Sequence, residues 1–155
     1  MAYVVFALRL ILGGLLIVAG VMKAHDGPAL TATTIAGYRI LPPSLVAPLG
    51  VALPYVEVLL GGYLLAGFLT RIAGWIAAAQ FAVFSAAVAS LVIRNIPADC
   101  GCFGSGIPTP PSWGHVAVDV ALACCAGVVA LRAPGAWALD ARLATSGSFE
   151  PQGEG

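Results

Sequence analysis

The stretch Ile72 to Ile93, IAGWIAAAQFAVFSAAVASLVI, decides the fold of this chain. It holds 22 consecutive residues without a charged side chain. As an α-helix, such a stretch rises about 33 Å at ~1.5 Å per residue, which matches the roughly 30 Å hydrocarbon core of a bilayer. A buried helix of a soluble protein is rarely apolar on every face. The stretch therefore predicts a helix that spans a membrane.

Apolar stretches of similar length lie on both sides of this one. Each is close to the ~20 residues that a spanning helix needs. The first has no basic segment before it of the kind that opens a signal peptide, so we expect a spanning helix there as well. The sequence thus predicts an all-α integral membrane four-helix bundle with both termini on the same face, its helices running over about 3–22, 46–69, 72–93 and 113–131.

The domain organisation follows from these spans. We expect one four-span domain over residues 1–144 and a flexible tail over residues 145–155, whose Gly, Ser and Glu content leaves it nothing to bury. The two longer connections, residues 23–45 and 94–112, are expected on the face opposite the termini. Pro48 and Pro54 are expected to bend the second span.

The overall composition excludes several classes of protein. The residues AVILMFWYC make up 60% of the 155 positions and DEKR only 9%, against about 25% charged residues in a soluble domain. Together with a mean hydropathy of +0.98, these values exclude a soluble globule and a disordered chain, and they make the lipid bilayer the surrounding partner. The formal net charge is zero and no run of Lys or Arg is present, so nucleic acid is excluded as a partner.

Two of the four cysteines lie in the second long connection, as Cys100-Gly101-Cys102. A disulfide between residues two apart closes a very small ring, which strains the bond and makes it easily reduced. The favoured interpretation is a redox-active, catalytic pair. Two alternatives stay open: plain structural cysteines, and a Cu(I) or zinc site completed by His25 or His115, although no cluster supplies the four ligands of a structural zinc site and no metal ligand is assigned. Cys124 and Cys125, inside the fourth span, are expected to be packing residues.

Ionisable side chains at membrane depth cost roughly 2.5 to 3.5 kcal/mol each on insertion scales, so their positions are informative. We expect Arg9 to pair with Glu57, organising the bundle or a quinone pocket, and Lys23 to pair with Asp119. The second pair would lie beneath the cysteines, where the cation stabilises a thiolate and the carboxylate relays a proton. The alternative is that the cations extend to the interfaces as anchors and that Glu57 is protonated.

Aromatic side chains flank the cysteine connection. Phe103 follows the second cysteine, and Trp113 begins the fourth span. Such residues anchor helices at the membrane interface. They are also candidates to form the wall of a cofactor site, for instance against a quinone ring.

Several segments of the chain together resemble one family, the MauE proteins, which belong with the DoxX-like redox-associated membrane proteins. The most specific element is the loop Cys100-Gly101-Cys102-Phe103-Gly104. The others are Arg9 to Gly13, Gly20 to Lys23, Tyr38 to Pro42, Pro54 to Glu57 with Gly61, and Trp113 with Asp119.

The resemblance implies a four-helix protein of the bacterial inner membrane that assists maturation of methylamine dehydrogenase, an enzyme with many disulfides, beside a thioredoxin-like periplasmic partner. The implied role is similar to that of DsbB and the vitamin K epoxide reductase family, which pass electrons between a soluble thiol protein and a membrane quinone. This chain lacks their CxxC motif and their second pair of loop cysteines.

These observations predict a membrane thiol–disulfide redox protein. It would act at Cys100 and Cys102 with a thioredoxin-like partner on a secreted, disulfide-containing client, with a membrane quinone as the candidate cofactor. Because such chemistry belongs to an oxidising compartment, the loop is expected outside the cytoplasm and both termini inside. The alternative functions are a non-catalytic membrane scaffold and a Cu(I)-handling protein that uses the same loop.

Overall fold

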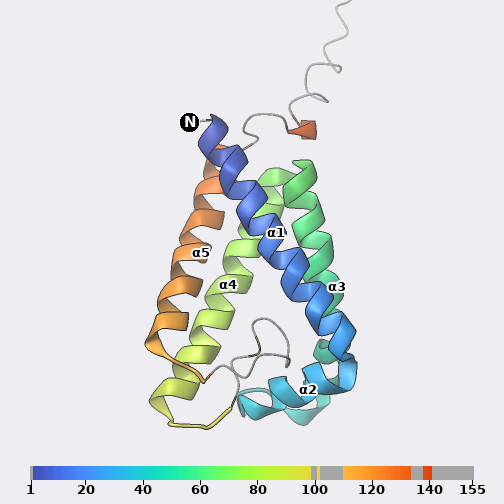
Figure 1. Cartoon of the computed structure of the whole chain (residues 1–155), viewed down its shortest axis with the longest axis vertical. Coiled ribbons are helices and arrows are strands. Elements are labelled where there is room, and N and C mark those ends of the chain that lie inside the picture. The colour runs from blue at the N-terminus through green and yellow to red at the C-terminus, as the bar shows by residue number, and fades with distance from the viewer. Residues whose placement is uncertain (1, 99–100, 102–109, 134–137, 141–155) are drawn as a thin grey trace, which may run out of the picture.

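The computed structural model describes residues 2–98, 101, 110–133 and 138–140. Within these ranges the long elements are all α-helices (Figure 1). Their bounds are Ala2–Asp26 (α1), Pro28–Gly37 (α2), Pro43–Ala66 (α3), Thr70–Ile93 (α4) and Trp113–Arg132 (α5).

Four of these helices, α1, α3, α4 and α5, are long and apolar enough to cross a membrane. They correspond one by one to the four expected spans, so the predicted all-helical, four-span architecture is confirmed. The first residues of α1 and the last residues of α5 lie at the same end of the bundle, as expected for an even number of crossings (Figure 1). We call this the termini end, and the opposite end the loop end.

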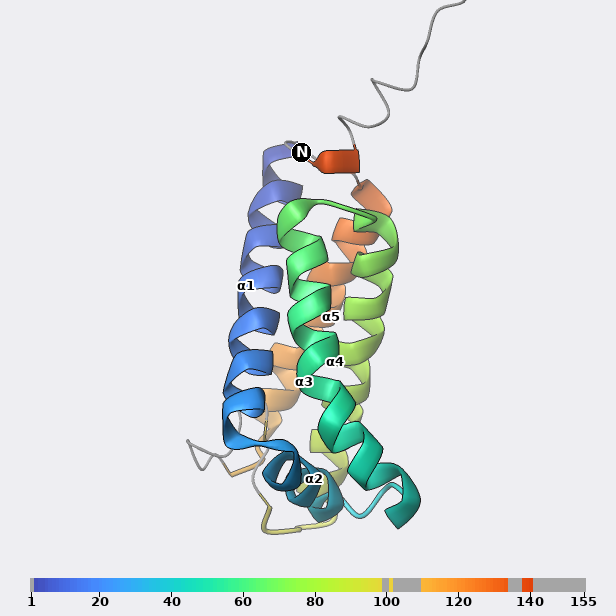
Figure 2. The same ribbon diagram turned by 90° about the vertical axis from the view of Figure 1, so that its right-hand side faces the viewer.

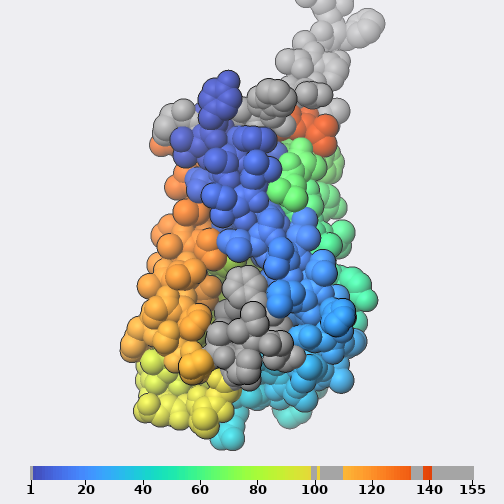
Figure 3. Space-filling view, in the orientation of Figure 1, coloured from blue at the N-terminus to red at the C-terminus, as the bar shows by residue number. Residues whose placement is uncertain are grey.

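The helices pack most closely in two pairs, α1 with α3 and α4 with α5. In the space-filling view α1 runs along the front of the bundle between α5 and α3 (Figure 3). Small residues let the backbones approach within each pair. A Cβ atom added at Gly61 would lie 2.6 Å from the carbonyl oxygen of Gly13, and one at Gly74 would lie 2.9 Å from the amide nitrogen of Ala130. Such contacts are the usual way in which helices associate in lipid.

Only some of the small residues in the spans lie at these contacts. Gly13 and Gly61 form the α1–α3 contact, and Ala73 and Ala77 are buried. Ala117 and Ala121, however, are exposed. In an alanine-rich chain, small residues occupy lipid-facing positions as well as interfaces, so composition by itself does not select the packed face.

The connection between the first two spans contains a helix that the sequence did not predict. Helix α2 lies across the loop end of the bundle (Figure 2). It begins at Pro28, directly after Gly27, whose φ is 89°, because proline suits the first turn of a helix. Its β-branched threonines give it a weak intrinsic helix preference. Packing holds it instead, since a Cβ at Gly50 of α3 would lie 2.8 Å from the Cβ of Ala32.

Helix α3 contains both prolines inside the span, at Pro48 and Pro54. The part of α3 near its start leans away from the axis of the rest (Figure 2). Proline has no amide proton and its ring crowds the preceding turn, so a bend at these positions is expected. The bend separates α3 from α4 toward the loop end, although a tight turn joins the two helices at the termini end (Figure 1).

Candidate functional site

A buried ion pair lies in the middle of the bundle. Lys23 of α1 donates from Nζ to Oε1 of Glu57 on α3 at 2.6 Å, and the exposed fractions of the two side chains are 5% and 1%. Gln80 of α4 donates to the same oxygen from Nε2 at 3.3 Å. Three helices thus supply one hydrogen-bonded cluster. A buried charge is tolerated only when it is paired in this way.

The close approach of α1 and α3 brings the two charges together. A Cβ at Gly20 would lie 2.6 Å from the carbonyl oxygen of Pro54 and 3.0 Å from the Cβ of Glu57. Side chains of a helix tilt toward its N-terminus, so Lys23 extends back along α1 past Gly20. Because α3 runs antiparallel to α1, that direction leads the ammonium group to Glu57.

Both predicted pairings are therefore wrong. Glu57 is bound by Lys23 and not by Arg9, which donates from Nε to the carbonyl oxygen of Leu64 at 2.9 Å. Leu64 lies about 10 Å farther along α3 than Glu57 at ~1.5 Å per residue, so Arg9 is held too far toward the termini end. The ion pair of Lys23 is with Glu57 and not with Asp119. Asp119 is nonetheless buried, with 7% of its surface exposed.

The ion pair lies between two cavities. The smaller one, of about 390 Å³, is lined by Glu57, Phe81, Phe84, His115 and Asp119 among others, so that the two carboxyl groups face one space between α1, α3, α4 and α5. At its edge the hydroxyl of Ser112 is hydrogen-bonded to Nδ1 of His115 at 2.8 Å.

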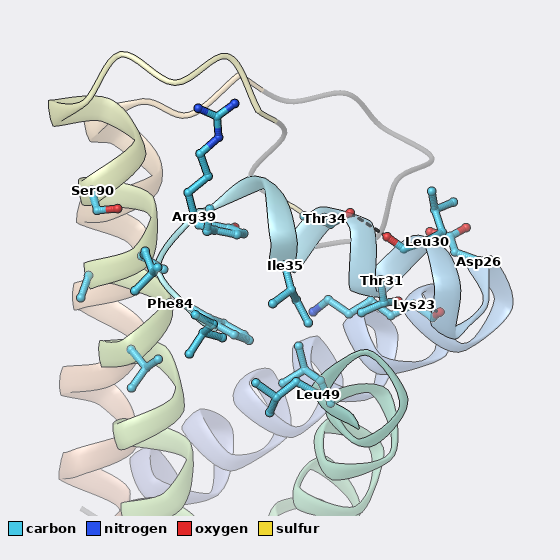
Figure 4. A pocket seen from close by; sticks show the side chains of 18 of the residues that line it. Lys23, Asp26, Leu30, Thr31, Thr34, Ile35, Arg39, Leu49, Phe84 and Ser90 are labelled. Atoms are coloured by element: carbon cyan, nitrogen blue, oxygen red, sulfur yellow. Dashed lines mark hydrogen bonds between the residues drawn. The ribbon is translucent and has the colours of Figure 1, made fainter. Parts of the chain in front are cut away.

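The larger cavity, of about 690 Å³, lies between α2, α3 and α4 and includes Lys23 on its inner wall (Figure 4). Its other walls are mostly apolar. Phe84 lines both cavities, and the Lys23 ammonium lies 5.3 Å from the centroid of the Phe84 ring. Gly101, the residue between the two loop cysteines in the chain, lines the larger cavity.

Gly101 is held tightly against α2. Its φ of 62° lies in the left-handed region that favours glycine. A Cβ at this position would collide with the Cγ2 atom of Thr34. The centre of the Cys-Gly-Cys segment is therefore packed onto the helix that covers the loop end.

The remaining predicted site residues have different outcomes. Cys100, Cys102 and Phe103 lie outside the described residues. Trp113 is the first residue of α5, is 58% exposed, and is not among the lining residues of either cavity. Cys124 is an exposed free thiol on α5, so the expectation that it is a packing residue is wrong. Within the described ranges, no three His, Cys, Asp or Glu side chains gather into a possible metal site.

Two side chains beside the ion pair, Gln80 and Phe84, were not predicted from the sequence. Gln80 is the one amide side chain inside the otherwise apolar 72–93 stretch, and its isolation there was an available signal. Phe84 gave no such signal, because it is one of three aromatic residues in the same span.

A second polar cluster closes the termini end of the bundle. Besides its bond to Leu64, Arg9 donates from Nη2 to the carbonyl oxygen of Leu65 at 3.3 Å, so it satisfies oxygens that the end of α3 leaves without helical partners. Asp140 accepts hydrogen bonds from the amide groups of Leu69 and Thr70, both at 2.8 Å, at the start of α4. A residue from beyond the last span thereby caps α4.

Asp140 gives a pH-dependent prediction. Partial burial raises its pKa, but the bonds from Thr70 and Leu69 and the nearby Arg9 cation outweigh this and leave the pKa below its usual value. We expect Asp140→Ala to lower the free energy of unfolding at pH 7 by about 1 kcal/mol, as for loss of a helix cap. Because the pKa of Asp140 is lower in the folded state than the ~3.9 of the unfolded state, its carboxylate stabilises the folded protein at pH values above ~3.9. This stabilisation disappears as the pH falls through the folded-state pKa.

The measurement is thermal unfolding of the detergent-purified protein between neutral and acidic pH. The difference between the wild type and Asp140→Ala should be largest near neutrality and should close in acid. Asp140→Asn is the control, because it keeps an oxygen acceptor without the charge and should retain part of the stability with no such pH dependence. A difference that stays constant down to acidic pH would contradict the assigned role of the carboxylate.

Four apolar spans around a buried ion pair define the chain as a multi-pass membrane protein. A family model described as "Methylamine utilisation protein MauE" matches residues 1–132. The methylamine utilization protein MauE of Paracoccus denitrificans is 32% identical over 134 residues, which cover 86% of this chain and 72% of that relative. The chain therefore belongs to the MauE family, which confirms the resemblance seen in its motifs. No solved structure matches it.

Proposed function

We propose that this protein is a membrane thiol–disulfide redox protein that acts through Cys100 and Cys102 on a thioredoxin-like partner outside the cytoplasm. Its client would be a secreted, disulfide-containing enzyme of the methylamine dehydrogenase type, since the matched relative is named for methylamine utilization. The supporting observation is the packing of Gly101 against Thr34 of α2. This contact holds the centre of the motif against α2 at the loop end.

The proposed exchange is balanced within the two proteins. A thiolate of the reduced partner attacks one sulfur of a Cys100–Cys102 disulfide, forming a mixed disulfide and releasing the other cysteine as a thiolate. The second thiolate of the partner then attacks the mixed disulfide. The partner leaves oxidised, and this protein is left with two thiols that carry the electron pair.

The buried polar residues would support this chemistry through their positions. Lys23 lines the same cavity as Gly101, and its positive charge would favour the thiolate form of a cysteine that comes close to it. Asp119 lines the other cavity together with His115 and is proposed as a group that relays protons. We keep both as positioning residues for the exchange.

The proposal includes an orientation. The loop end would face the oxidising side of a bacterial inner membrane, and both termini would lie in the cytoplasm, with residues 1–144 as one domain and residues 145–155 as a flexible tail. Disulfide exchange with a secreted client requires the cysteines on that side.

Labelling of intact spheroplasts tests the orientation and the resting redox state together. A membrane-impermeant maleimide should modify Cys100 and Cys102 only after mild reduction, as mapped by mass spectrometry. Labelling without reductant would contradict a resting disulfide. Labelling only after lysis would contradict the orientation and, with it, the proposed periplasmic exchange.

Single-cysteine variants test the exchange itself. Cys100→Ser and Cys102→Ser should each abolish turnover of a reduced thioredoxin-like protein, and one of them should accumulate a reductant-sensitive mixed disulfide with it. Cys124→Ser is the matched control, because that thiol is exposed on α5 and should leave exchange unchanged. Full client maturation in each of the two loop variants would contradict the redox function and favour a non-catalytic scaffold.

A further inference from the structure

We propose that the larger cavity, between α2, α3 and α4, binds the ring of a membrane quinone, with Lys23 at its polar oxygen and Phe84 against its face. This inference rests on the proposed function, because thiol exchange delivers an electron pair that needs an acceptor. The site differs from the one expected from the sequence, which combined Arg9, Glu57, Phe103 and Trp113.

The dimensions and walls of the cavity fit an apolar ring with a hydrocarbon chain. Its volume of about 690 Å³ lies within the range of roughly 300–1,000 Å³ found for small-molecule sites. The walls are mostly apolar and come from α2, α3 and α4, with Lys23 and Asp26 at the end of α1; Ile35, Leu49 and Val83 are among the aliphatic residues (Figure 4).

The cavity is continuous with the lipid-facing surface of the bundle. Val83 lines it and is 65% exposed, so the cavity reaches the outer face of α4. It lies toward the loop end, where α3 and α4 have separated and α2 covers the bundle (Figures 1 and 2). A lipid-soluble ligand can therefore enter the site from the membrane.

Four charged side chains line the cavity, Lys23, Asp26, Arg39 and Arg94, and of these only Lys23 is buried. The ammonium of Lys23 has three donors, and its bond to Glu57 uses one of them. That bond fixes Lys23 at the inner wall and balances its charge. A carbonyl oxygen can therefore accept a bond from Lys23 without bringing a charge into the bundle. Phe84 lines the cavity beside Lys23 and supplies an aromatic surface for contact with the quinone ring.

Gly101, the residue between the two cysteines in the chain, forms part of the cavity wall. This is the observation that relates the cavity to the proposed thiol exchange. The step is balanced. Two thiols lose two electrons and two protons as their disulfide forms, and the two carbonyl oxygens of the quinone take them up to give the quinol. A phospholipid fits an apolar cavity too, but it accepts no electrons, and the experiment separates the two.

The test measures binding of decylubiquinone to the detergent-purified protein and maps the site with a photoreactive azidoquinone. We expect photolabelling of α2, α3 or α4 at residues that line the cavity, and displacement of the label by decylubiquinone. Val83→Trp should raise the Kd for decylubiquinone about tenfold or more. The added indole occupies the volume in which the quinone ring would bind, and the surrounding side chains cannot move aside without cost. Leu53→Trp fills it from the α3 side and should do the same.

Ile76→Trp is the matched control. Ile76 is an exposed aliphatic residue on the same helix, two turns before Val83 and absent from the cavity wall, so its variant should keep the wild-type Kd. Photolabel confined to α5 or to the part of α1 before Lys23, or equal displacement by a phospholipid without a quinone ring, would overturn the proposal. So would an unchanged Kd in both cavity-filling variants.

The proposed function is tested apart from this site by mixing the oxidised protein with one equivalent of a reduced thioredoxin-like protein in the absence of quinone. A single exchange should occur there without any quinone. Failure of that exchange, with decylubiquinone still bound at the cavity, would reject the thiol function and leave the binding site supported. Normal exchange with no quinone binding would reject the site alone.

Discussion

Lys23→Met is expected to lower the free energy of unfolding of the bundle by about 3–5 kcal/mol, the usual cost of removing one partner of a buried ion pair. The variant leaves Glu57 almost fully enclosed. Of its two side-chain donors within the described residues, Lys23 at 2.6 Å is lost and Gln80 at 3.3 Å remains. The carboxyl group must then stay charged with too few partners or take up a proton.

The double variant Lys23→Met/Glu57→Met should recover most of this loss. Apolar side chains of similar size replace a buried ion pair at little cost, and sometimes with a gain, because no charge has to be desolvated. Thermal unfolding of Lys23→Met, Glu57→Met and the double variant in the same detergent gives the coupling energy between the two residues.

Arg132→Met provides the control for loss of a positive charge, since Arg132 is exposed at the end of α5. It should change stability by less than about 0.5 kcal/mol. If Lys23→Met were no more destabilising than Arg132→Met, or if the double variant were as unstable as the single one, the ion pair would not hold α1 against α3.

Gly61→Ala is the second large expected effect. The added methyl group would lie 2.6 Å from the carbonyl oxygen of Gly13 and 2.7 Å from Cγ1 of Ile17. The nearer atom belongs to the backbone of α1, so the contact is relieved only by moving a whole helix. Overpacking of this kind costs about 1–3 kcal/mol, and it should lower the midpoint of thermal unfolding in detergent.

The neighbouring residue supplies the control. A Cβ at Gly62 meets nothing within 4 Å, so Gly62→Ala should be neutral or raise stability by up to about 1 kcal/mol through the better helix preference of alanine. Equal destabilisation by the two variants would contradict the α1–α3 contact at Gly61.

The sequence predicted the fold well because membrane insertion is decided locally. Each span is recognised by its own length and apolar content, as the uncharged 72–93 stretch illustrates, and no knowledge of the other spans is required. Helix α2 was missed for the opposite reason. Its ten residues are too few to be stable alone, and it forms against Gly50 of α3.

The candidate site was only partly predictable. The cost of burying charge made the positions of four ionisable residues in the spans informative, and all four are buried: Arg9, Lys23, Glu57 and Asp119. Their partners did not follow. A pairing depends on how far antiparallel helices are shifted along each other, and a shift of one turn, ~5.4 Å, exchanges one partner for another.

By itself, then, the sequence determined that this protein is a four-span helical membrane protein with buried charges and a Cys-Gly-Cys segment between its last two spans. Only the tertiary structure decided that Lys23 meets Glu57 and that Asp140 caps α4. It alone also revealed a lipid-facing cavity beside Gly101. The reason is physical: hydrophobicity acts residue by residue along the chain, whereas ion pairs, caps and cavities depend on side chains that only the packing of separate helices brings within a few ångströms.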